Sequence, residues 1–405
     1  MAAEGIVVRI PTPAEIESFR FVLARNFGVD PRPDGAEGFK RIWERDRAFC
    51  AWDGPELVGT LGSFSLQLSV PGGTVATGGA TMVSVAPTHR RRGILRQMMA
   101  AHFRDVADRG EPLSALWASE AAIYGRFGYG PAAQGVDLRI PRTYTTLHRL
   151  VPSPAQVRLV DEHEGRRLIP SIYERIAPSW PGFISRSAEW WEERWFKDPP
   201  DRRNGATALR FALTASNDGY ALYRQKHKYD QGNSSGELIV VDVLGTNPES
   251  WAGLWSFLLH HDLPATIEAV QRSPIDPIFD LLESPRRMTA GRRDSIWIRT
   301  HDPAAALAAR RYQVDGRLVL EVIDPVMDRT VAVELEGGPD GATCQITSKA
   351  PDLVLDIEDL GACYLGWSRF RTLARAGRIG GDKASLALAD LMFAWDPLPW
   401  CPEVF

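Results

Sequence analysis

The sequence predicts an α+β protein of several domains, and three observations support this prediction. Its 405 residues exceed the roughly 100–200 residues of an ordinary domain, so two or three domains are expected. Up to about residue 140 the predicted order is a strand, a helix, an antiparallel meander, and then a further helix and strand. A similar order begins again after residue 153. We therefore expect domains at 1–153, 154–300 and 301–405.

The composition argues against several classes of protein. Apolar residues make up 44% of the chain and charged residues 24%, which is typical of globular proteins. A net charge of −4 argues against a general nucleic-acid binder, and we find neither a signal peptide nor a stretch apolar enough to cross a bilayer. The four cysteines form no Cys-x-x-Cys pair, so neither a disulfide framework nor a metal site is expected. We expect a cytoplasmic protein with no nucleic-acid or membrane partner.

The first domain opens with a strand at 6–10 and a helix with clear start signals. Thr12 is a suitable N-cap, Pro13 fits the first turn, and Glu15 completes a capping box. Apolar residues from Ile16 onward recur at helical spacing. Further strands are expected at 47–52, at 57–70, from the turn at 71–73 to Val85, at 113–118, and finally near Asp137.

The most informative stretch, 81–96, is predicted to be a strand, a basic loop and the start of a helix. Pro87 ends the strand because it has no N–H for a ladder. The first turn of a helix carries N–H groups without partners and the positive end of the helix dipole. The arginines at 90–92 add charge, and Gly93 lets an anion approach the backbone. This context favours a phosphate site over a solvated basic turn, which three arginines alone would also fit.

After a glycine-broken short helix at 119–130 and a linker at 152–154, the opening order repeats. A strand at 157–159 precedes a helix capped at Asp161, and strands at 219–228 and 237–244 lead into a helix from Pro248. The loop before that helix, 245–250, has no arginine, and its Glu249 would repel a phosphate. We infer a second copy that has lost anion binding, with an unrelated α/β domain as the alternative.

The third unit begins near Pro303. Its prolines prevent the tail, 396–405, from being helical, and Trp400 and Phe405 within it require burial, so the tail is expected to be docked. The elements expected before it are helices at 304–311, 360–365, 367–376 and 383–395, the last capped by Asp382, and strands at 318–322, 330–336 and 342–347.

The arginine loop resembles the coenzyme A pyrophosphate loop of the GNAT superfamily of N-acetyltransferases, Gln/Arg-x-x-Gly-x-Gly/Ala, except at Leu95. The whole pattern resembles the Eis ("enhanced intracellular survival") family of that superfamily, in which leucine is normal there. The stretch 85–96 carries this resemblance, and 118–130 carries it more specifically through its run Ile-Tyr-Gly-Arg-Phe-Gly-Tyr-Gly. The segment 219–224 and the terminal Phe405 also fit.

The resemblance implies tandem acetyltransferase (GNAT) folds, the second degenerate, and a C-terminal sterol-carrier-protein-like α/β domain. It also implies a homohexamer, acetyl-CoA as cosubstrate and no metal. The strand at 83–85 would bind the pantetheine like an added strand, and the backbone of 91–96 would bind the pyrophosphate. The coenzyme-binding residues that the resemblance implies are Val83, Ser84, Val85, Arg91, Arg92, Gly93, Ile94, Leu95, Arg96, Ser119 and Glu120.

Two catalytic groups are implied by the same resemblance. Tyr124 is the expected general acid, since a phenol with a pKa of about 10 stays protonated at neutral pH; a core tyrosine is the alternative, and Tyr129 fits that description. The α-carboxylate of Phe405 is the expected general base. Other family members can carry an acidic residue just before the terminal aromatic, which helps to hold cationic substrates. Here Val404 occupies that position, and in an extended tail Glu403 points elsewhere.

We therefore expect acetyl transfer to primary amines of polycationic small molecules, aminoglycosides first. The alternatives are a lysine ε-amine of peptides or proteins, and a lipid- or partner-binding protein with a vestigial transferase domain. His260 and His261 are interpreted as a helix end, because adjacent residues do not share a helix face. Candidates for the amine pocket, each also compatible with a scaffold role, are Asp30, Trp43, Phe27 and Phe64.

Overall fold

The computed structural model describes residues 5–30, 36–149 and 153–405. These residues form two compact units. The first contains the chain up to Ala132, the stretch Ile296–Trp395 and the last two residues, and the second contains Ala133–Ser295 and Asp396–Glu403. No helix among the described residues is both long enough and apolar enough to span a bilayer.

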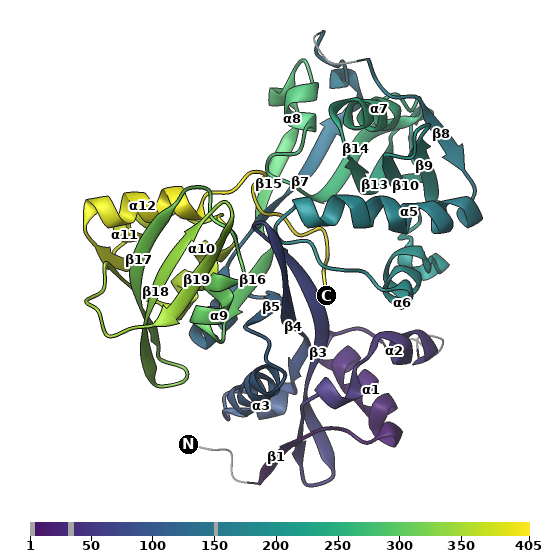
Figure 1. The fold of residues 1–405 in the computed structure, drawn as a ribbon. Coiled ribbons are helices and arrows are strands. Elements are labelled where there is room, and N and C mark those ends of the chain that lie inside the picture. The colour runs from purple at the N-terminus through teal and green to yellow at the C-terminus, as the bar shows by residue number, and fades with distance from the viewer. Residues whose placement is uncertain (1–4, 31–35, 150–152) are drawn as a thin grey trace. The chain divides into compact units, whose positions relative to one another are not determined.

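The first unit contains a seven-stranded sheet in which only β4 and β5 run parallel to each other. Helices α1 (Ile16–Phe27) and α2 (Ala36–Ile42) lie on one side of β3 and β4, and α3 (Ile94–Asp108) lies on the other (Figure 1). The short α4 (Ala121–Tyr124) follows β5. The order across the sheet is β1 (Ile6–Arg9), β2 (Cys50–Asp53), β3 (Glu56–Val70), β4 (Gly73–Val85), β5 (Leu113–Trp117), β16 (Ile296–Thr300) and β6 (Gly130–Pro131).

The strand expected near Asp137 exists, but it does not complete the first sheet. This strand, β7 (Gln134–Pro141), pairs with β14 and β15 in the sheet of the second unit. Its place in the first sheet is taken by β16, which pairs with β5 on one edge and with β6 on the other. The chain leaves the first unit after Ala132 and returns at Ile296. Alternation predicted the strand but could not say which sheet it joins.

The first unit also contains a five-stranded sheet covered by helices. Its interior is filled by side chains: the rings of Phe370 and Phe393 lie 4.8 Å apart, and both side chains are buried. Asp382 caps the last helix as expected, and the two short strands β20 and β21 were not expected. The elements are β17 (Gly316–Asp324), β18 (Arg329–Gly338), β19 (Gly341–Ile346), β20 (Leu353–Asp356), β21 (Ile379–Gly381), α9 (Pro303–Ala308), α10 (Ile357–Tyr364), α11 (Phe370–Arg375) and α12 (Lys383–Phe393).

The second unit repeats the plan of the first sheet. The parallel pair here is β13 and β14, joined through α7, just as β4 and β5 are joined through α3. Asp161 caps α5, as expected. The sheet order is β15 (Thr289–Asp294), β7, β14 (Pro264–Arg272), β13 (Gly236–Gly245), β10 (Gly219–Lys226), β9 (Arg210–Thr214) and β8 (Val157–Val160). The other elements are α5 (Glu162–Ile176), α6 (Ala188–Trp190) with a π-helical turn (Trp191–Phe196), α7 (Pro248–Leu259), α8 (Ile278–Leu281), and a ribbon of β11 (Tyr229–Asp230) and β12 (Asn233–Ser234).

The tail is extended and docked, as its composition predicted. Trp400 is 1% exposed, packs against Trp180 and Phe183, and donates a hydrogen bond to a backbone carbonyl. The carboxylate of Glu403 is buried against the guanidinium of Arg186. The last two residues belong to the first unit.

Candidate active site

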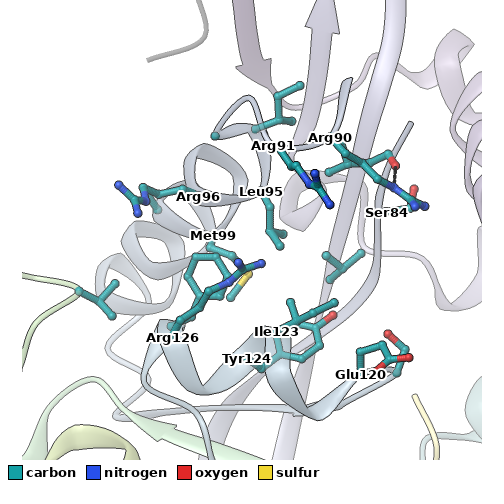
Figure 2. A pocket seen from close by; sticks show the side chains of 18 of the residues that line it. Ser84, Arg90, Arg91, Leu95, Arg96, Met99, Glu120, Ile123, Tyr124 and Arg126 are labelled. Carbon is teal, nitrogen blue, oxygen red and sulfur yellow. Dashed lines mark hydrogen bonds between the residues drawn. The ribbon is translucent and has the colours of Figure 1, made fainter. Parts of the chain in front are cut away.

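The first unit contains a cavity of about 1210 Å³ beside the end of β4. Its walls are the last residues of β4, the basic loop, the first turns of α3 and the segment from Ser119 to Phe127 (Figure 2). Most of the lining comes from the two stretches that the sequence singled out, 81–96 and 118–130. The structure therefore brings the basic loop and Tyr124 to one cavity.

The end of β4 offers an open backbone edge to this cavity. Its pairing with β5 covers only Thr77–Ala80, so within the described strands the residues that follow have no partner on that side. At Met82 the backbone adopts a left-handed conformation with φ 53°, where the register with β3 shifts. Ser84 is fixed in place because its hydroxyl accepts a hydrogen bond from Asn26 at 3.0 Å. An extended ligand can therefore bind along Val83–Val85 as an added strand would.

The N-terminus of α3 lies at the same cavity with its N–H groups uncapped. Gly93 is the N-cap residue, has φ 80°, and provides no side chain to accept those N–H groups. Arg91 also has a positive φ, 64°, which costs a non-glycine residue about 1–2 kcal/mol. Residues in such conformations orient successive N–H groups toward one point and so form anion sites. The strained loop and the helix N-terminus together are suited to bind a phosphate group.

The three arginines of the loop diverge. Arg91 lines the cavity, and so does Arg96 from the first turn of α3. Arg92 does not line it; its guanidinium lies 3.5 Å from the carboxylate of Asp53. Arg90 lines the cavity and donates to the carbonyl of Val85 at 3.4 Å. Arg91 and Arg90 therefore line the cavity while Arg92 does not, and only Arg90 of these two also contacts the Val85 carbonyl.

The corresponding helix of the second unit, α7, has a different N-terminus. Asn247 caps it by accepting a hydrogen bond from the Ser250 N–H at 2.8 Å, and the Ser250 hydroxyl accepts from the Asn247 N–H. This reciprocal pair satisfies the N–H groups that remain uncapped in α3. With Glu249 in its first turn, α7 is unsuited to bind an anion.

Tyr124 ends α4, lines the cavity and is only 5% exposed. Burial raises the pKa of its phenol above the ordinary value, and a hydrogen bond with the Ser119 side chain opposes that rise. The group is therefore a neutral proton donor at physiological pH. Tyr129 is the core tyrosine: it is fully buried and accepts a hydrogen bond from the Ser114 hydroxyl at 2.8 Å.

A buried arginine that the sequence analysis missed holds the Tyr124 segment in place. Arg299 on β16 donates to the carbonyl of Phe127 at 2.9 Å and to the carboxylate of Asp324 at 2.6 Å. A Cβ added at Gly128, which has φ 78°, would lie 2.0 Å from this guanidinium, and one at Gly130 would lie 2.0 Å from a backbone oxygen of α10. Because neither glycine has a side chain, Gly128 leaves room for Arg299 and Gly130 leaves room for α10 of the third domain. No local pattern marks Arg299, because its partners are distant in sequence.

The remaining candidates are dispersed. Phe405 is not among the residues that line the cavity: it is 8% exposed, and its ring lies beside β4, where a Cβ on Gly79 would be 3.4 Å from it. Among the amine-pocket candidates, Phe27 lines the cavity, whereas Trp43 packs on Phe19 with ring centroids 5.3 Å apart.

Two further amine-pocket candidates also lie away from the lining. Asp30 is exposed and Phe64 is buried on β3, and neither lines the cavity. His260 and His261 end α7, and each ring bonds to a backbone carbonyl one turn earlier, as expected for a helix end.

Comparison with known proteins identifies each part of the chain. An acetyltransferase (GNAT) domain family matches residues 7–132, a second acetyltransferase (GNAT) domain family matches 182–311, and a sterol carrier protein domain family matches 303–402. The crystal structure of Eis1 from Mycobacterium abscessus is similar with a TM-score of 0.85 at 31% identity, covering 98% of this chain and 100% of that one. A GNAT protein from Anabaena variabilis, at 20% identity and a TM-score of 0.86 over 99% of this chain and 100% of its own, shares the fold.

The curated relatives match over nearly their whole length. An N-acetyltransferase of Streptomyces coelicolor is 36% identical over 98% of this chain and 99% of its own. The N-acetyltransferase Eis of Mycobacterium tuberculosis is 34% identical over 95% of this chain and 96% of its own. The expected architecture, two GNAT domains and a C-terminal sterol-carrier-protein-like domain, is therefore confirmed, and this chain belongs to the Eis family of N-acetyltransferases.

Proposed function

We propose that the protein transfers the acetyl group of acetyl-CoA directly to primary amines of polycationic small molecules, with aminoglycosides as the first class to test. One observation carries the proposal: the open edge of β4, the uncapped N-terminus of α3 and the buried Tyr124 line a single cavity. Acetyl-CoA needs a site for its phosphates, a slot for its pantetheine arm and a proton donor near its sulfur. The cavity offers one candidate for each.

In this mechanism the coenzyme's arm binds along Val83–Val85, and its pyrophosphate binds the backbone of 91–96. Ser119 and Glu120 line the side of the slot toward Tyr124. The amine nitrogen attacks the thioester carbon, a C–N bond forms, and the tetrahedral intermediate then breaks its C–S bond. The α-carboxylate of Phe405 accepts a proton from the substrate ammonium, which leaves the neutral amine that attacks, and Tyr124 gives its proton to the departing sulfur.

The placement of acidic side chains bears on the amine. Glu120 is exposed and lines the cavity, so it can attract a cationic substrate. Val404 is 46% exposed, whereas Glu403 is 2% exposed and its carboxylate accepts hydrogen bonds from Arg186 and Trp195. The terminal carboxylate is therefore the main negative group that the tail itself offers to a cationic substrate. We expect weaker aminoglycoside binding than in relatives with an acid at the position of Val404.

We also propose that the active form is a cytoplasmic homohexamer, as the family resemblance implies. The exposed apolar side chains of Val7, Ile10 and Phe21 provide surface suited to contacts between subunits. Light scattering on a sizing column would give the mass, and a monomer at micromolar concentration would contradict the assembly.

The test of the activity is a thiol-release assay with acetyl-CoA and a panel of aminoglycosides, polyamines and lysine peptides. We expect turnover of at least one polyamine or aminoglycoside, and a Tyr124→Phe variant should lose roughly 10²–10⁴-fold in kcat while the Kd of acetyl-CoA is retained. Turnover of lysine peptides alone would favour the protein-acetyltransferase alternative. Acetyl-CoA binding without any turnover would favour a vestigial transferase.

A further inference from the structure

The cavity extends beyond the pyrophosphate loop to a wall that the third domain supplies. Its lining includes Pro325, Val326 and Met327, which form the turn between β17 and β18. Phe103, two turns and more along α3 from the loop, lines the cavity as well. From Gly93 to Phe103 the helix rises about 15 Å, at about 1.5 Å per residue. The cavity is therefore longer than a pyrophosphate site requires.

The turn is held firmly against the acetyltransferase core. Arg299 and Arg329 both bind the carboxylate of Asp324, and the N–H of Met327 donates to the same carboxylate at 3.4 Å. Val326 packs against the apolar cluster of the first domain. Met327 is 49% exposed. The turn thus presents a fixed apolar surface to the cavity.

Arg126 provides a positive charge beside this surface. It follows Tyr124 in the chain, lines the cavity and is exposed. Its one recorded contact within the described chain is with the ring of its neighbour Phe127, whose centroid lies 5.3 Å from the guanidinium carbon. Figure 2 shows Arg126 extending from the segment after Tyr124 while Arg91 extends from the loop on the other side. A cation without a carboxylate partner at a cavity wall is suited to an anionic ligand.

Coenzyme A carries two separate anionic groups, a 5′-diphosphate and a 3′-phosphate on the ribose. The loop at Arg91 and the helix N-terminus account for the first. We propose that Arg126 binds the 3′-phosphate, and that the tip Pro325–Met327 packs against the adenine ring, for which an apolar surface with a polarisable thioether is suited. This assignment rests on the proposed use of acetyl-CoA, and it gives the third domain a part in binding the coenzyme.

The first test measures the Kd of coenzyme A and of 3′-dephospho-coenzyme A by calorimetry. The wild type should prefer coenzyme A by about tenfold or more, because a charge-assisted contact is lost with the phosphate. Arg126→Met should raise the Kd of coenzyme A to that of the dephospho form and leave the Kd of the dephospho form unchanged. Arg126→Lys should restore part of the preference for coenzyme A. Arg104→Met, on the exposed face of α3 outside the cavity, is the matched control and should change neither Kd. Equal weakening of both ligands by Arg126→Met, or none, would overturn the assignment.

The second test places a negative charge on the turn. Met327→Glu should raise the KM of acetyl-CoA about fivefold or more, while turnover of S-acetylpantetheine, which lacks the nucleotide, stays at the wild-type level. An equal loss with both donors, or no loss with acetyl-CoA, would refute the role of the turn.

The two proposals fail in distinguishable ways. In one outcome, Arg91→Met raises the Kd of both coenzyme A and its dephospho form while Arg126→Met changes the two Kd values equally or not at all. In that case the pyrophosphate site stands and the 3′-phosphate site is wrong. If the wild type binds neither ligand, the use of acetyl-CoA itself is wrong.

Discussion

Replacing Arg91 by alanine tests the coenzyme site against a control that the loop itself provides. Arg91 lines the cavity, while Arg92 next to it pairs with Asp53 at 3.5 Å. Both are arginines of one loop, so their substitutions remove the same charge from almost the same place. Only Arg91 is expected to meet the ligand with its side chain.

The two magnitudes follow from these surroundings. A charge-assisted hydrogen bond contributes about 1.5–3 kcal/mol, so Arg91→Ala should raise the Kd of acetyl-CoA by roughly 10- to 150-fold. Arg92 and Asp53 are 40% and 37% exposed. Loss of an exposed pair of this kind costs the fold only about 0–1 kcal/mol. Because Arg92 does not line the cavity, Arg92→Ala removes no direct contact with the ligand and should change the Kd of acetyl-CoA less than about fivefold.

Calorimetric titration with acetyl-CoA at low and high salt is the assay. The effect of Arg91→Ala should shrink as salt rises, because exposed charges are screened. In steady-state kinetics the KM for acetyl-CoA should rise more than the KM for the amine. Equal effects of the two substitutions, or a larger effect of Arg92→Ala, would show that the loop has been misinterpreted.

The remaining predictions concern the tail and the buried charges. Appending residues after Phe405 displaces the terminal carboxylate, so a C-terminally extended protein should lose most of its kcat while it still binds acetyl-CoA; full activity would refute the general-base role. Arg186→Met leaves the buried carboxylate of Glu403 without its cation, whereas Asp242 keeps Arg272 at 3.5 Å, so the free energy of unfolding measured in urea should fall by about 3–5 kcal/mol; a loss below about 1 kcal/mol would contradict a paired, buried Glu403. Burial, with smaller contributions from nearby arginines, lowers the pKa of His102 to about 3 from its ordinary value near 6.5. Because the folded-state pKa is the lower one, the stability from this group is present above about pH 6.5 and is lost as the pH falls toward 3, at up to about 1.4 kcal/mol per pH unit. In the His102→Gln variant the free energy of unfolding should fall less steeply as the pH drops from about 6.5 toward 3. An unchanged dependence on pH would contradict a buried, neutral His102.

Local patterns predicted the parts of the site that local chemistry determines. The end of β4, the helix start after Gly93 and the cap at Asp161 follow from residues next to one another in sequence, and the structure has each of them. The docked tail followed in the same way from the aromatic character of Trp400. These features need no knowledge of what lies opposite in space.

Several features that sequence analysis missed depend on partners that are distant in sequence. The strand β16 belongs to the first sheet because the chain returns from the second unit, which alternation along the strand does not encode. Arg92 pairs with Asp53, 39 residues away, and Arg299 binds both Phe127 and Asp324. A guanidinium is directed by the carboxylates and carbonyls around it, so its sequence neighbours give little information about where it points.

The proposed mechanism requires the thioester of acetyl-CoA to bind between the hydroxyl of Tyr124 and the terminal carboxylate of Phe405. A crystal structure of the protein with coenzyme A and an amine substrate measures this directly. We expect the coenzyme sulfur within hydrogen-bond distance of the Tyr124 hydroxyl, and the substrate amine within reach of the carboxylate, directly or through one water. A sulfur remote from Tyr124, or a Phe405 carboxylate directed into solvent, would refute this mechanism.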